Sequence, residues 1–142
     1  MSYDLIVYTR SSRFPEPHRL AEEVSARSPG LTLPPELDLR AADGYVPLAS
    51  TGFEVSRSAV TPADVEDHRE ALKEAGDPDD EHLGVLLESD TCIAFHCQND
   101  DEISTARIVA GAVAKLSGGY VYDPQLDVSA RASYLPSPTV TE

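Results

Sequence analysis

The segment that most constrains the fold is Tyr3-Asp4-Leu5-Ile6-Val7-Tyr8-Thr9. Aromatic and β-branched residues favour strands. The Leu-Ile-Val run in its middle predicts a strand that is buried on both faces. A strand of this kind needs neighbouring strands and other elements packed against it, and the rest of the sequence must supply them.

The next part of the chain offers one helix and a pair of strands. A helix is expected to begin at Pro17, carry apolar residues at helical spacing, and stop at Ser28-Pro29-Gly30. Residues 31–39 alternate in part but contain two consecutive prolines, so any strand there is short or lies at an edge. Tyr45 to Ala49 and Phe53 to Val55 predict two strands of a hairpin or a bulged bend.

The residues from Thr61 onward strongly favour the start of a second helix. Thr61 is the expected N-cap, Pro62 occupies the first helical position, and Asp64 can reach back as in a capping box. Gly76 supplies the stop. Beyond it, a short helix over about Pro78 to Leu87 competes with a strand over 84–87.

The last elements are a strand, a long helix and a final strand. Thr91 to Cys97 predicts a strand, followed by an acidic turn over 98–102 and an alanine-rich helix from Ile103 to Leu116. Gly118-Gly119 is expected to end the helix with left-handed backbone. Tyr120-Val121-Tyr122 then forms a short strand.

This element order predicts an α+β fold, with a single mixed β-sheet and two or three helices packed mainly on one face. We expect residues 1–125 to form one domain and residues 126–142 an irregular tail rich in Ser, Pro, Ala and Thr. The sequence has no apolar run long enough for a membrane span and no signal-peptide pattern at its start. The expected location is the cytoplasm, without contact to a membrane.

Acidic residues are concentrated in one part of the chain. The net charge is −14, and residues 61–102 hold 14 acids and 2 bases. A field of this sign repels nucleic-acid backbone and anionic membrane and favours basic partners. Acids at helix starts also complement the helix dipole, which explains some of them without a partner. The candidate partner-binding residues are Asp77, Asp79, Asp80, Glu81, Asp100, Asp101 and Glu102.

Cys92, His96 and Cys97 form the tightest group of reactive residue types. Cys92 and Cys97 are expected to point to opposite faces of one strand, which argues against a disulfide between them. Cys92 and His96 share a face but lie roughly 13 Å apart along a straight strand. The sequence therefore assigns no catalytic residue and no metal ligand, and we expect no cofactor. A small enzyme that uses Cys92 or a carboxylate pair stays open as an alternative.

The segment from Ile103 to Gln125, which ends in Lys-Leu-Ser-Gly-Gly-Tyr-Val-Tyr-Asp-Pro-Gln, runs from an alanine-rich helix through a glycine pair into a short strand. In this shape, and as a small acidic α+β chain, the sequence resembles immunity proteins of bacterial polymorphic and secretion-delivered toxin systems. The resemblance implies a non-enzymatic protein that neutralises a cognate basic toxin by occluding its active site. An acidic mimic of nucleic acid that inhibits a DNA- or RNA-binding enzyme is the alternative binding function.

Overall fold

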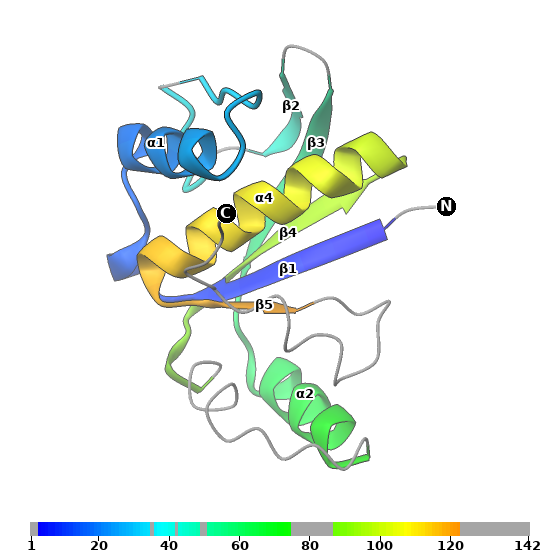
Figure 1. The fold of residues 1–142 in the computed structure, drawn as a ribbon. Helices are drawn as coiled ribbons and strands as arrows, with labels where there is room; N and C mark the ends of the chain where they lie inside the picture. Colours follow the sequence, from blue (N-terminus) through cyan, green and yellow to red (C-terminus); the bar gives the residue numbers. More distant parts are fainter. Residues whose placement is uncertain (1–2, 35, 42, 49–50, 75–86, 123–142) are drawn as a thin grey trace.

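Figure 1 shows the computed structural model, which describes residues 3–34, 36–41, 43–48, 51–74 and 87–122. The elements in chain order are β1 (Tyr3–Thr9), the 3₁₀ turn η1 (Ser11–Arg13), α1 (Pro17–Arg27), β2 (Gly44–Pro47), β3 (Gly52–Ala59), α2 (Pro62–Glu74), β4 (Thr91–Cys97), α4 (Asp100–Ser117) and β5 (Tyr120–Tyr122). No helix in these ranges combines the length and the apolar character needed to cross a membrane.

The strands form one five-stranded sheet in the order β2-β3-β4-β1-β5. The predicted α+β class and the single sheet are confirmed. The expectation of a mixed sheet is wrong, because all four strand pairings are antiparallel. β4 and β5, which α4 connects along the chain, run in the same direction. They do not pair with each other, because β1 lies between them in the sheet.

One face of the sheet carries the main core. α4 lies diagonally across this face and α1 packs against α4 (Figure 1). Leu5 and Val7 of β1 and Ile93 and Phe95 of β4 are fully buried there. Phe53 of β3 meets Phe95 edge to face, with ring centroids 5.3 Å apart. Aromatic pairs in this geometry add to the stability that their burial provides.

The opposite face carries a smaller cluster around Tyr8. Ile6, Val60, Cys92 and Tyr122 pack against Tyr8, and Val65 of α2 joins them. The prediction that β1 is buried on both faces holds for the α4 face and in part for this one, where Tyr8 is buried but Asp4 and Ile6 are partly exposed. Of the helices in the described residues, α1 and α4 cover the first face, while α2 contacts the second face near one end of the sheet.

The start of α2 follows the sequence closely. Thr61 N donates to the Asp64 carboxylate over 2.9 Å, and Asp64 N donates to Thr61 Oγ1 over 3.2 Å. This reciprocal pair is the expected capping box. At the end of α4, Gly118 has φ 70°, as predicted for a left-handed stop.

Four local expectations differ from the structure or fall outside it. The described residues of 31–39 form no strand; instead Leu33 and Leu39 insert into the core from an irregular segment. α4 begins at Asp100 rather than Ile103, because Asn99 provides the cap. The predicted element over 78–87 lies almost wholly outside the described residues, and the predicted tail over 126–142 lies entirely outside them.

Candidate functional site

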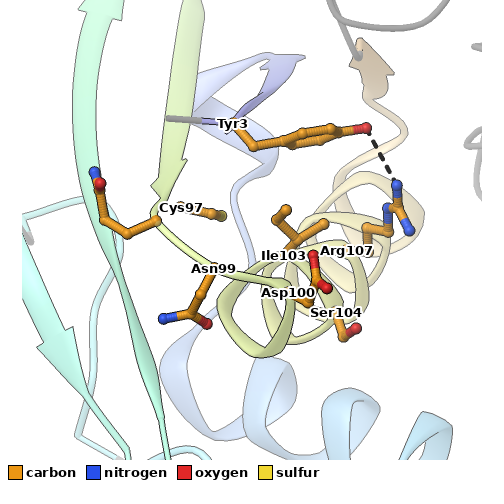
Figure 2. Close-up of a pocket in the computed structure, with 8 residues that line it drawn as sticks. Tyr3, Cys97, Asn99, Asp100, Ile103, Ser104 and Arg107 are labelled. Carbon is orange, nitrogen blue, oxygen red and sulfur yellow. Dashed lines mark hydrogen bonds between the residues drawn. The ribbon is translucent and has the colours of Figure 1, made fainter. Parts of the chain in front are cut away.

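A hollow of about 460 Å³ lies beside the first two turns of α4, and Figure 2 shows the side chains around it. This volume is within the usual range of small-ligand sites. Its lining residues come from the start of β1, the end of β4 and α4: Tyr3, Cys97, Gln98, Asn99, Asp100, Ile103, Ser104 and Arg107.

The sequence brings these side chains together by helical spacing and strand register. Asp100, Ile103 and Arg107 recur at intervals of three and four along α4, so they lie on one side of the helix. Tyr3 and Cys97 are direct partners in the β1–β4 register, at the end of the sheet beneath that turn. The hollow therefore marks the place where two strands end under the start of a helix.

The walls of the hollow have both charges and an apolar part. The Arg107 guanidinium donates to Tyr3 Oη over 3.1 Å and lies 5.6 Å from the centroid of the Tyr3 ring. Asp100 contributes a carboxylate, and partly buried Ile103 contributes an apolar surface. Burial, with the nearby charges of Glu102 and Asp4, raises the pKa of the Cys97 thiol to about 11. Cys97 is therefore a neutral part of the wall.

The candidate acids at the start of α4 have two different roles. Asp100 and Asp101 are exposed in the first turn, and we find no hydrogen bond or ion pair for either within the described part of the chain. Glu102 is only 9% exposed, and its carboxylate accepts a hydrogen bond from Gln98 N over 2.8 Å. The Glu102 carboxylate is thus engaged within the chain, and its place in the predicted docking surface stays a prediction.

The other four candidates, Asp77, Asp79, Asp80 and Glu81, lie outside the described residues. The described acids of residues 61–102 fall at opposite ends of β4. Asp90 precedes Thr91 at the end where α2 begins, whereas Asp100 and Asp101 follow Cys97 at the other end. The run of charge in the sequence is thus divided between two parts of the surface.

A second group of polar residues lies on the sheet face opposite α4. Asp4, Ser56 and His96 come from β1, β3 and β4. His96 Nδ1 lies 2.9 Å from Asp4 Oδ1, and His96 Nε2 lies 3.1 Å from Ser56 Oγ. Asp4 and His96 are direct register partners, whereas Ser56 pairs with Ala94 and so lies diagonally from His96. The sequence did not predict this line of three groups, because the register between strands brings them together.

The two cysteines behave as predicted. Cys97 is buried on the α4 face and Cys92 is partly exposed on the opposite face, and both are free thiols. Cys92 Sγ lies 2.9 Å from Ser58 Oγ. Both ring nitrogens of His96 face Ser56 and Asp4, so Cys92 and His96 form no nucleophile–base pair.

Among the described residues, no three His, Cys, Asp or Glu side chains come together in a way that would hold a metal ion. Comparison with protein-family models, with curated proteins and with solved structures finds no match for this chain. Its function must therefore be argued from its own residues.

Proposed function

We propose that this chain is an immunity protein, which binds a cognate basic toxin domain and neutralises it by occluding the toxin's active site. The observation that carries the proposal is the exposed pair Asp100–Asp101 beside the hollow of about 460 Å³. A helix start needs little acid for its own stability, and Glu102 already provides the capping carboxylate of α4. Asp100 and Asp101 therefore remain accessible to a partner.

The chemistry around the pair suits a basic side chain. The aliphatic stem of a lysine or arginine can lie on apolar surface while its charged end meets a carboxylate. Ile103 offers that apolar surface and Asp100 offers the carboxylate at the same hollow, whereas the Tyr3 ring already contacts the Arg107 guanidinium. The strongly negative net charge of the chain would also steer a basic partner toward it and raise the rate of association.

The proposed docking surface also includes Asp77, Asp79, Asp80 and Glu81, and for these four the proposal rests on charge alone. They precede Asp100 by about twenty residues in the sequence. An experiment that tests the two groups separately will show whether one or both contribute to binding.

The test uses the full chain and, as candidate partner, a basic protein encoded by an adjoining reading frame. Asp100→Asn with Asp101→Asn removes two charges and keeps side chains that tolerate a helix start. Glu22→Gln with Glu36→Gln is the matched control, because both residues are exposed and lie outside the acidic segment. A second test variant neutralises the four acids of 77–81.

The affinity of each variant is measured by calorimetry at low and at high salt. Exposed ion pairs contribute about 0.2–1 kcal/mol each, so the Asp100/Asp101 variant should bind roughly 2- to 30-fold more weakly at low salt. The control should bind as the unsubstituted chain does. Equal affinity of both double variants at low salt would remove Asp100 and Asp101 from the proposal. Failure of the partner to bind the unsubstituted chain would contradict the function itself.

A further inference from the structure

The Asp4–His96–Ser56 line has a definite order of donors and acceptors. An ionised carboxylate can only accept hydrogen bonds, so Asp4 Oδ1 selects the imidazole tautomer that carries its proton on Nδ1. In neutral His96, Nε2 then has a lone pair and accepts a hydrogen bond from the Ser56 hydroxyl at 3.1 Å. A carboxylate that orients an imidazole, which in turn accepts a proton from a serine, is the arrangement that activates serine nucleophiles.

Solvent reaches these groups. The Asp4 and His96 side chains are 36% and 32% exposed, and Ser56 is also partly exposed. A small molecule can therefore approach Ser56 Oγ from the outer side of the sheet. The base, His96 Nε2, lies within hydrogen-bond reach of the same oxygen. Both conditions for general-base assistance to a serine, contact and access, are met by the geometry.

We propose that Ser56 is a nucleophilic site that accepts an acyl group from a small activated ester, with His96 as its base and Asp4 as the positioning residue. Ser56 Oγ forms a bond to the acyl carbon, and the bond from that carbon to the leaving oxygen breaks. The proton passes from Ser56 Oγ to His96 Nε2 and from there to the leaving oxygen. The product is a serine ester on β3, and the step needs no further reactant.

The site supplies a base, but Ser56 does not line the hollow beside α4 or three other hollows in the described part of the chain. A preorganised oxyanion hole contributes much of the rate of hydrolytic enzymes. We therefore assign a single acylation of Ser56 rather than repeated turnover. This modification site is separate from Asp100 and Asp101 of the proposed docking surface, because it lies on the sheet face opposite the helix α4 that carries them.

The chain contains a matched internal control. Ser58 lies two residues further along β3 on the same face and is exposed, but its hydroxyl faces Cys92 Sγ instead of a histidine. The experiment treats the full-length protein with p-nitrophenyl acetate and follows acetylation of each serine by peptide mass mapping. General-base assistance is worth on the order of 100-fold, so Ser56 should be acetylated about 100-fold faster than Ser58.

His96→Gln should lower the rate at Ser56 to that at Ser58, whereas Ser58→Ala should leave Ser56 unchanged. Asp4→Asn should lower the rate at Ser56, because an amide no longer fixes the productive tautomer. Equal acetylation of Ser56 and Ser58 in the unsubstituted chain would overturn the proposal without the need for any variant. An unchanged Ser56 rate in folded His96→Gln protein would overturn it as well.

Discussion

The Glu102 carboxylate reaches back over the start of α4 and accepts a hydrogen bond from the backbone N–H of Gln98, with a length of 2.8 Å. In the same turn, the Asn99 side chain accepts from Glu102 N over 3.0 Å. The second bond satisfies a donor that the helix itself leaves without a partner, and the first ties Gln98, which precedes the N-cap, to the first turn. α4 packs against four of the five strands, so a stable first turn supports the helix that covers the main core.

Removal of this cap should destabilise the fold measurably. Glu102→Ala is expected to lower the free energy of unfolding by about 1–2 kcal/mol, because the Gln98 N–H loses its acceptor in a partly buried site. Glu102→Gln keeps an acceptor oxygen and should retain most of the stability. Urea denaturation of the two variants checks this. An equal loss in both would mean that the charge, and not the hydrogen bond, stabilises the turn.

Gly119 should tolerate no larger residue, for reasons of space. A Cβ at this position would lie 2.6 Å from Tyr8 O and 3.0 Å from Thr9 Cβ, between β1 and the turn into β5. Gly119→Ala is therefore expected to cost about 1–3 kcal/mol of unfolding free energy. Gly30→Ala is the control, because a Cβ there meets nothing within 4 Å, and its effect should stay within about 0.5 kcal/mol. Thermal unfolding of both variants distinguishes the two sites.

The pH dependence of stability should reveal the contribution of Glu23 of α1, whose carboxylate contacts Lys115 of α4. Burial raises the pKa of this carboxyl, but hydrogen bonds and charges from Lys115 and Arg27, each 3.1 Å away, outweigh burial and hold the pKa below its ordinary value of 4.5. Ionised Glu23 therefore stabilises the fold fully above that value, and the stabilisation is lost as the pH falls through the lowered pKa. Below pH 4.5, stability should fall less steeply in Glu23→Gln than in the unsubstituted chain. Parallel curves for the two proteins in acid would contradict this role.

The two thiols should differ sharply toward alkylating reagents. Burial raises the pKa of Cys97 to about 11, so little thiolate forms in the native protein, and the residue is also inaccessible. Cys92 is partly exposed. With iodoacetamide at about pH 8, Cys92 should be alkylated in the native state and Cys97 only after denaturant is added. Native alkylation of Cys97 at the rate of Cys92 would show that the end of β4 opens readily.

Local chemistry could be predicted from the sequence where it is carried by neighbours in the chain. The capping box of Thr61 and Asp64, the bounds of β4 at Thr91–Cys97 and the left-handed Gly118 all depend on residues a few positions apart. Their backbone conformations follow from side-chain shape and hydrogen bonding within one turn. Contacts between distant parts of the chain are compatible with these local conformations and do not determine them.

The candidate site was harder to predict, because pairing across the sheet decides it. Asp4 and His96 are 92 residues apart, and only the β1–β4 register makes them neighbours. Glu102 looked like part of an acidic turn, since nothing in the local sequence indicates which of three consecutive acids turns inward. Which acid turns inward depends on where α4 begins. The helix begins at Asp100, after the cap at Asn99, and not at Ile103 as predicted, so Glu102 lies in the first turn and not in the preceding loop.

The place of β1 in the sheet has a consequence for biosynthesis. β1 precedes the other strands in the chain, yet its two neighbours are residues 91–97 and 120–122. Protein chains emerge from the ribosome N-terminus first. Both edges of an apolar strand therefore stay without their partners until nearly the whole described chain has been translated. Unpaired edges attract other strands, so interrupted synthesis of this protein should yield aggregation-prone fragments, and chaperones that hold nascent chains should recognise Tyr3–Thr9.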